Sequence, residues 1–253
     1  MKHLAIYYIA TSNYKEGFKY FKQNLEYFYP DMRKTVIILS DGLDEWDNVT
    51  EGNISYKVQH IQHMPWPIVA LFKMNYIVEH KINCDYVCFT QANLQINKDY
   101  DYSSTRIDLS KLNLTRHASA ENTKDNIVVL DGYKYAPSIN KDSIAYIHKP
   151  YTYVQAGFFI GPADIVYDMC DSVSKMVEID LRRNIIPQWH DESYLNKWRM
   201  LHKDLVAPLK KLISVETYEK DKPVAMVNTI SKDRTTVICI TDKKLYEDLK
   251  NKQ

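Results

Sequence analysis

Glycine is scarce in this chain, and the phosphate-binding loops that glycine builds are absent. The sequence holds only 6 glycines in 253 residues. Neither a GxGxxG nor a GxxxxGK pattern occurs, which excludes the common loops that hold nucleotide phosphates. An excess of one charge sign is also missing, because 33 lysines and arginines are balanced by 32 aspartates and glutamates. This balance gives no indication of nucleic acid or an anionic membrane as a partner.

Cysteine is sparse as well, and its spacing excludes the usual zinc and redox motifs. The four cysteines, Cys84, Cys88, Cys170 and Cys239, form no CxxC pair. We expect free, buried thiols in a reducing compartment. No charged and then apolar leader opens the sequence, and no apolar run reaches the roughly 20 residues that span a bilayer. These absences predict a cytoplasmic protein without a transmembrane segment.

The apolar pattern of the first hundred residues predicts an α/β fold. A buried strand is expected at 3–11, and further strands at 34–40, 55–61 and 84–90. Helices are expected at 15–28, with Phe18, Phe21, Leu25 and Phe28 on one face, and at 68–80. This alternation favours a mostly parallel central sheet with flanking helices. Because no linker or internal repeat divides residues 1–253, a single domain is expected.

In such a sheet, ligands bind beyond the carboxyl ends of the parallel strands. Three segments follow strand ends here: residues 9–14, the Ser40-Asp41 turn and residues 91–93. We expect these segments to share one rim, which is the natural place for a nucleotide.

The rest of the chain holds fewer regular elements. Strands are expected at 112–117, 153–160, 224–227 and 235–240, a long helix at 163–182 and a turn at 214–218. The polar stretch 118–143 is either a mobile lid or an ordinary surface loop. The small pair Ala156-Gly157 would let a ligand approach the backbone of its strand.

The stretch WHDESYLNKW, residues 189–198, holds the residues best suited to sugar chemistry. Two adjacent carboxylates, Asp191 and Glu192, follow Trp189 and His190. Aromatic faces stack on sugars, and carboxylates stabilise a cationic anomeric carbon. We expect Asp191 or Ser193 to cap a helix here. The inner face of that helix would carry Tyr194, Leu195 and Trp198. Local chemistry also fits a plain capping box at the start of a surface helix.

With the segments around it, this stretch resembles glycosyltransferase family 6, the family of the blood-group A and B transferases and α1,3-galactosyltransferase. The resemblance covers about residues 3–218. Its pieces are IATSNY (9–14), TVIILSDG (35–42), WPIVALFK (66–73), the strand into 91–93, His117, AYI (145–147), YVQAGFFIG (153–161) and WHDESYLNK (189–197). The family implies one GT-A-type domain, with a nucleotide-binding half at about 1–100 and an acceptor and catalytic half at about 101–253. It also implies a retaining transfer of galactose or N-acetylgalactosamine from UDP to the 3-hydroxyl of a galactoside.

The resemblance also implies roles for single residues on the donor side. Ile9, Ala10, Thr11 and Tyr14 would bound the uridine. Lys73 replaces an arginine that usually contacts the donor, so a point-charge contact is implied in place of a bidentate one.

The carboxylates and the acceptor site follow from the same match. Asp191 would bind hydroxyls of the donor sugar. Glu192 would lie beneath the anomeric carbon, as nucleophile or as electrostatic support. The acceptor would be an oligosaccharide or glycolipid, with or without fucose, bound by His117, Trp189 and His190.

Donor choice would depend on Gln155, Ala156 and Gly157. The third position of this triplet lies near the 2-substituent of the sugar in the relatives. Glycine leaves room for an N-acetyl group, which favours UDP-GalNAc over UDP-Gal.

The largest departure from the family pattern is at Gln91, Ala92 and Asn93. Mammalian members carry Asp-x-Asp there and hold a divalent cation, whereas bacterial members replace both acids with amides. Neutral amides are poor ligands for a hard cation. We therefore predict an enzyme of the bacterial type that uses no metal and no other cofactor. For such an enzyme, attachment to the periphery of the inner membrane stays open.

Other departures leave a second function open. The family's HPG motif is His117-Ala118-Ser119 here, its ERR segment is missing, and its tail is matched only by Arg234, Lys243, Lys244 and Lys250. An inactive relative that binds UDP-sugars is the alternative. A glycoside hydrolase fits less well, because adjacent carboxylates cannot easily flank a bond from opposite sides. A zinc hydrolase built on His190 and His202 lacks the required ligand spacing.

Overall fold

The central sheet has four parallel strands at its middle and antiparallel strands at both edges. The computed structural model describes residues 1–62, 64, 67–98, 100–102, 107–116, 140–149, 151–210, 212–214 and 226–228. In spatial order the strands are β3 (Thr50–Glu51), β4 (Ile54–His60), β2 (Arg33–Ser40), β1 (His3–Ala10), β5 (Tyr86–Gln91), β8 (Val154–Pro162) and β7 (Asn113–Arg116). The pairs β4–β2, β2–β1 and β1–β5 are parallel. The expected mostly parallel α/β sheet is confirmed.

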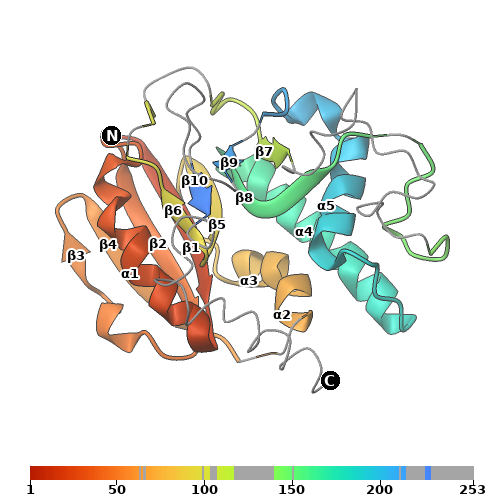
Figure 1. Cartoon of the computed structure of the whole chain (residues 1–253), viewed down its shortest axis with the longest axis horizontal. Coiled ribbons are helices and arrows are strands. Elements are labelled where there is room, and N and C mark those ends of the chain that lie inside the picture. The colour runs from red at the N-terminus through yellow and green to blue at the C-terminus, as the bar shows by residue number, and fades with distance from the viewer. Residues whose placement is uncertain are drawn as a thin grey trace.

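Alternate residues of the central strands β1 and β2 face two different apolar layers. On β1, Leu4, Ile6 and Tyr8 face a layer that includes Phe18 and Phe21 of α1 (Gly17–Gln23). Ala5 and Tyr7 face the other layer, to which three longer elements contribute. These are α3 (Lys73–Glu79), α4 (Ala163–Arg182) and α5 (His190–Leu201). Figure 1 shows α1 apart from these helices, with α4 and α5 beside β7 and β8.

Two predicted helices are shorter than expected. The helix predicted at 15–28 is divided into η1 (Ser12–Glu16), α1 and η2 (Leu25–Tyr27). Asn24 leaves helical geometry at φ −114° and ψ 10°, and its side-chain amide donates to the carbonyl of Ile96 at 2.9 Å. The helix predicted at 68–80 is divided at Phe72 into α2 (Ile68–Leu71) and α3. The apolar face predicted for residues 15–28 was correct, since Phe18, Phe21, Leu25 and Phe28 are all buried.

A small second sheet was not predicted as such. It consists of β6 (Leu94–Ile96), β10 (Met226–Asn228) and β9 (Ile213–Ser214). The strand β10 overlaps the strand expected at 224–227, and β9 ends at Ser214, where a turn was expected to begin. The strand expected at 235–240 lies outside the described residues, as do residues 117–139, which include most of the lid or loop segment.

Hydrogen bonds to a buried carboxylate hold α4 and α5 against the segment at 143–147. Asp180, which is fully buried, accepts hydrogen bonds from Ser143 Oγ at 2.6 Å, Ile144 N at 3.0 Å and Tyr194 Oη at 3.1 Å. Lys197 of α5 donates to the carbonyl of Tyr146 at 2.9 Å. The short helix η5 (Lys203–Leu205) follows α5, and η3 (Asp44–Trp46) lies between β2 and β3.

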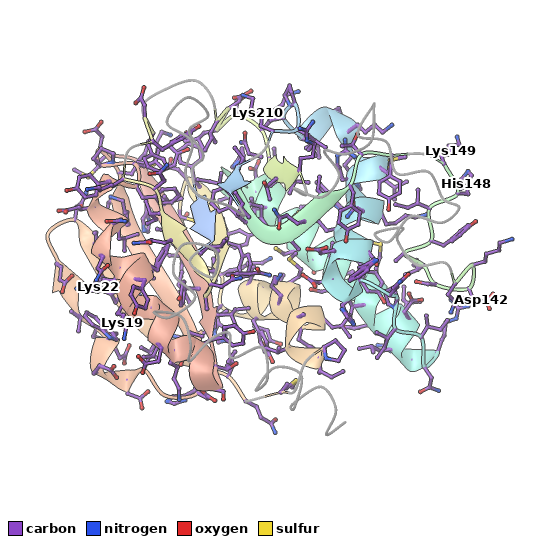
Figure 2. The ribbon with its side chains drawn as sticks, in the orientation of Figure 1. Lys19, Lys22, Asp142, His148, Lys149 and Lys210 are labelled. Carbon is purple, nitrogen blue, oxygen red and sulfur yellow. The ribbon has the colours of Figure 1, made fainter. Side chains whose placement is uncertain are left out.

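Charged side chains are distributed widely over the surface. In Figure 2, Lys19 and Lys22 on α1 lie far from Lys149 and Lys210. Cys84, Cys88 and Cys170 are free thiols, as expected, and Cys239 lies outside the described residues. Within the described residues, no helix combines the length and the apolar character that a bilayer crossing requires.

Candidate active site

The three segments predicted to share a rim do lie together. Strand register places Ile9 of β1 opposite Gln91 of β5 and Ala10 opposite Ser40 of β2. Ser40 Oγ donates to the carbonyl of Ala10 at 2.6 Å, and Ser12 N donates to Asp41 Oδ1 at 3.0 Å. The Asp41 carboxylate also pairs with Lys15 at 3.2 Å. The carboxyl ends of β1, β2 and β5 therefore form one continuous edge.

The four residues expected to bound a uridine stand at this edge with different exposure. Ala10 and Thr11 are buried, Ile9 is partly buried and the side chain of Tyr14 is 40% exposed. Ser12 adopts a positive φ of 52°, which turns the chain from β1 into η1. The exposed Tyr14 ring is thereby presented beside the edge, where a base could stack. Contact with uridine stays a prediction.

The segment that begins at Gln91 is held by Tyr8 and lies next to Gly157 of β8. Tyr8 Oη donates to the carbonyl of Ala92 at 3.0 Å. A Cβ added at Gly17 would lie 2.1 Å from that same carbonyl oxygen, so only glycine fits beneath it. A Cβ added at Gly157 would lie 3.0 Å from Gln91 Oε1. The expected donor triplet and the expected pyrophosphate segment are therefore neighbours.

The helix α5 begins earlier than the sequence predicts. We expected Asp191 or Ser193 as the cap, but the cap residue is Trp189 and the helix begins at His190, which has a positive φ of 45°. Ser193 Oγ instead accepts a hydrogen bond from Trp189 N at 3.3 Å. The hydroxyl of Ser193 therefore serves the backbone N–H of Trp189, which precedes the helix, and Ser193 is not the cap residue. Asp191 and Glu192 consequently lie in the first helical turn.

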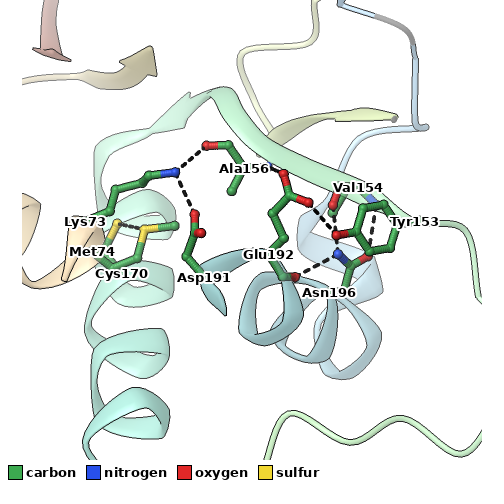
Figure 3. A network of polar contacts seen from close by, with 9 residues as sticks. All are labelled: Lys73, Met74, Tyr153, Val154, Ala156, Cys170, Asp191, Glu192 and Asn196. Carbon is green, nitrogen blue, oxygen red and sulfur yellow. Dashed lines mark hydrogen bonds and ion pairs between the residues drawn. The ribbon is translucent and has the colours of Figure 1, made fainter. Parts of the chain in front are cut away.

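Asp191 is held by Lys73 in a buried ion pair. Lys73 Nζ lies 2.6 Å from Asp191 Oδ2, and the two side chains are 4% and 8% exposed. The same Nζ donates to the carbonyl of Ala156 at 2.9 Å and lies 4.7 Å from the centre of the Phe89 ring. Figure 3 shows Lys73 reaching toward Ala156 on β8 and Asp191 on α5. The cation therefore joins α3, α5 and β8 at one point, and direct contact of Lys73 with a donor stays a prediction.

Glu192 is bound through both carboxylate oxygens by groups at the start of β8. Tyr153 Oη donates to Glu192 Oε2, and Ala156 N donates to Glu192 Oε1 at 3.1 Å (Figure 3). Burial and the neighbouring charge of Asp191 raise the pKa of Glu192 to about 7, against the opposing effect of these two donors and of Lys73. The carboxylate is thus oriented, on a residue that is only partly buried, and its pKa lies in the neutral range.

Asn196, one helical turn after Glu192, fixes the distance between α5 and β8. Its side chain accepts from Val154 N at 2.9 Å and donates to the carbonyl of Val154 at 2.8 Å. It also donates to the carbonyl of Glu192 at 2.8 Å. Sequence reasoning missed Asn196 and Tyr153, although both lie inside the two motifs and the i, i+4 spacing from Glu192 to Asn196 was visible.

The structure brings together most of the predicted site residues. The strand β8 links the two ends of the site, because Gly157 meets Gln91 while Ala156 meets Lys73 and Glu192. His190 is partly buried beside Asp191, and burial lowers its pKa. Trp189 directly precedes it. The structure places Gln155 on β8 and Asn93 just beyond β5, whereas His117, Arg234 and the three tail lysines lie outside the described residues.

The residues at 91–93 do not fit a divalent cation. Gln91 and Asn93 offer neutral amides, and Ala92 offers no side-chain ligand. Gln91 Oε1 lies against the backbone of Gly157, and the carbonyl of Ala92 accepts from Tyr8. Throughout the described ranges, no group of three or more His, Cys, Asp or Glu side chains is placed to hold a metal ion. Metal independence itself stays a prediction.

Two comparisons with known proteins bear on this site. The model of glycosyltransferase family 6 matches residues 130–245, a range that includes β8 and α5. The chain is also similar to the O-antigen biosynthesis glycosyltransferase WbnI of Escherichia coli. The two sequences are 25% identical over 236 residues, which is 88% of this chain and 92% of that protein. The similarity therefore extends over most of both proteins.

Proposed function

We propose that the chain, which is similar to glycosyltransferase family 6, is a retaining α1,3-glycosyltransferase of that family. It moves N-acetylgalactosamine, or galactose, from a UDP-sugar to the 3-hydroxyl of a galactoside. The observation that carries this proposal is the orientation of Glu192 by two hydrogen-bond donors, next to an Asp191 held by Lys73. A carboxylate held in a fixed orientation, with a second carboxylate beside it, is suited to stabilising the positive charge that develops at the anomeric carbon.

Each part of the site has one task in this proposal. The uridine lies on the edge formed by residues 9–14, with the diphosphate toward residues 91–93. Asp191 binds hydroxyls of the donor sugar. As the bond from the anomeric carbon to UDP breaks, Glu192 supports the positive charge that develops there or bonds to that carbon. The acceptor oxygen then bonds to the anomeric carbon on the face that UDP leaves, and the proton of the acceptor hydroxyl passes to the departing diphosphate. His117, Trp189 and His190 hold the acceptor.

The departing UDP is stabilised without a cation. The amides of Gln91 and Asn93 cannot supply the charge that a hard metal ion needs from its ligands. Hydrogen-bond donors from the backbone, Lys73 or the basic tail take over that task. Lys73 can do so only by partly exchanging its contact with Asp191, which lies at 2.6 Å.

The choice of donor sugar is inferred from the triplet at residues 155–157 on β8, and the class of acceptor from the similarity to WbnI. Gly157 carries no side chain, so the 2-acetamido group of UDP-GalNAc can approach the strand there once the Gln91 side chain, whose Oε1 would lie 3.0 Å from a Cβ at this position, moves aside. The similarity to an O-antigen biosynthesis enzyme supports an oligosaccharide or glycolipid of a bacterial surface polysaccharide as the acceptor. A cytoplasmic location, with or without attachment to the inner membrane, is consistent with such an acceptor.

One assay tests the proposal against the inactive alternative. UDP release is measured in EDTA, with UDP-GalNAc or UDP-Gal, and with and without a fucosylated or unfucosylated galactoside. We expect release that depends on the acceptor, persists in EDTA and is lost in Glu192→Gln. Binding of the UDP-sugar without turnover would identify the inactive relative. A strict requirement for Mn²⁺ would contradict the metal-free mechanism.

A further inference from the structure

We propose that Tyr153 is a positioning residue, whose hydroxyl acts with the backbone N–H of Ala156 to hold the Glu192 carboxylate ionised and aimed at the sugar. This inference rests on the proposed function, because it concerns the same carboxylate. Tyr153 lies one residue before β8, and its side chain is fully buried. Its hydroxyl donates to one oxygen of Glu192, and Ala156 N donates to the other at 3.1 Å.

The geometry of this arrangement is fixed by Asn196. Its amide binds both polar groups of the Val154 backbone, at 2.9 and 2.8 Å, and the carbonyl of Glu192 at 2.8 Å. Val154 directly follows Tyr153, so the distance from the phenol to the carboxylate is set by the backbone. Figure 3 shows Tyr153 and Asn196 on the side of Glu192 opposite Lys73. The carboxylate therefore cannot rotate without giving up one of its donors.

The charges around Glu192 make this hydrogen bond important. Asp191 on the same helix repels its negative form, and burial disfavours that form further, so the pKa of Glu192 stands at about 7. Tyr153, Ala156 N and Lys73 act in the opposite direction, and His190 lies on the same turn. Burial, together with the charge of Glu192, raises the pKa of Tyr153 well above its ordinary value. The phenol thus remains a donor throughout the working range of pH.

Tyr153→Phe removes the donor and keeps the ring. Because the charged form of Glu192 then loses one hydrogen bond, the acid limb of the kcat profile should move to higher pH by about one unit. Below pH 7 we expect kcat to fall by about tenfold or more, since less of the carboxylate is ionised and it is less well aimed. KM for the donor should change little, because the Tyr153 side chain is fully buried and out of reach of a bound substrate. A purely structural role would lower activity without moving the limb.

The matched control is Tyr102→Phe. Tyr102 is also buried and also donates its hydroxyl, in this case to the carbonyl of Asn97 at 3.1 Å. It packs against Phe28 and Tyr29 in a separate apolar layer. This variant should show the unaltered acid limb, so any common effect of losing a buried hydroxyl is subtracted.

Carbon-detected NMR of the Glu192 carboxyl group separates failure of this inference from failure of the proposed function. The titration midpoint should rise in Tyr153→Phe whether or not the chain turns over substrate. An unchanged midpoint and an unchanged acid limb would overturn the inference, even in an active enzyme. If Tyr153→Phe does not fold, the unaltered chain still gives a readout. A far-downfield hydroxyl proton of Tyr153 should be present and lost in Glu192→Gln, and its absence would also overturn the inference.

Discussion

Replacing Lys73 by methionine should destabilise the protein strongly, because it leaves a buried aspartate without its partner. The Lys73 and Asp191 side chains are 4% and 8% exposed, with Nζ and Oδ2 2.6 Å apart. Removing one member of a buried ion pair typically lowers the free energy of unfolding by about 3–5 kcal/mol, since the remaining charge is neither paired nor hydrated. Methionine keeps much of the apolar stem of lysine, so lost packing adds little. We expect the free energy of unfolding to fall by about 3–5 kcal/mol.

Urea denaturation of four proteins measures this loss: the unaltered chain, Lys73→Met, Asp191→Leu and the double variant. The double variant should be more stable than the sum of the single losses implies, by about 1–3 kcal/mol, because it holds no unpaired buried charge. Lys175→Met is the matched control. Lys175 also pairs with an aspartate, at 2.5 Å from Asp171, but its side chain is 68% exposed, so its loss should barely change stability. A cost at Lys73 within about 1 kcal/mol of the unaltered chain, or strict additivity, would refute the reasoning.

Three further predictions concern single side chains near the site. The folded chain holds a proton on Glu192 up to a pKa of about 7, against an ordinary 4.5. The free energy of unfolding should therefore fall by up to about 3 kcal/mol as pH rises from 4.5 to 7, and Glu192→Gln should flatten that slope in urea titrations at several pH values. Asp180→Ala should cost about 3 kcal/mol in thermal or urea unfolding, because it leaves buried donors without their acceptor; a loss under 1 kcal/mol would contradict this. Gly157→Ala should lower the ratio of kcat/KM for UDP-GalNAc over UDP-Gal by about tenfold, because the new methyl group approaches Gln91 Oε1 and narrows the space for the 2-substituent; an unchanged ratio would remove Gly157 from donor choice.

The sheet could be predicted from the sequence because its central strands are nearly continuous apolar runs. Leu4, Ile6 and Tyr8 face one layer while Ala5 and Tyr7 face the other, so both faces of β1 are buried. Strands covered on both faces in this way are typical of parallel sheets. The expected rim followed from this topology alone, and the bonds between Ser12 and Asp41 confirm it.

Errors occurred where a single polar side chain competes with the backbone. Asn24 divides the predicted first helix by binding Ile96, which lies 72 residues later. Ser193 binds the N–H of Trp189 in place of capping the helix from its own position. Such choices depend on which backbone groups the tertiary fold leaves unpaired, and a local pattern does not contain that information.

The sequence predicted which residues belong to the candidate site, but it did not predict which of them contact one another. The motifs identified Lys73, Asp191 and Glu192. The contact between Lys73 and Asp191 joins residues 118 positions apart, and no local spacing indicates it. Tyr153 was passed over because an aromatic residue at the start of an apolar strand is ordinarily a packing residue.

The most direct test of the account is the structure of Glu192→Gln crystallised with UDP-GalNAc and without divalent cations. The account predicts the uridine beside residues 9–14 and the sugar over Ala156 and Gly157. The side chain at position 192 should approach the anomeric carbon to about 3–3.5 Å from the face opposite UDP. A donor bound with its anomeric carbon remote from position 192, or bound only when a metal ion joins the diphosphate to Gln91 and Asn93, would contradict the account.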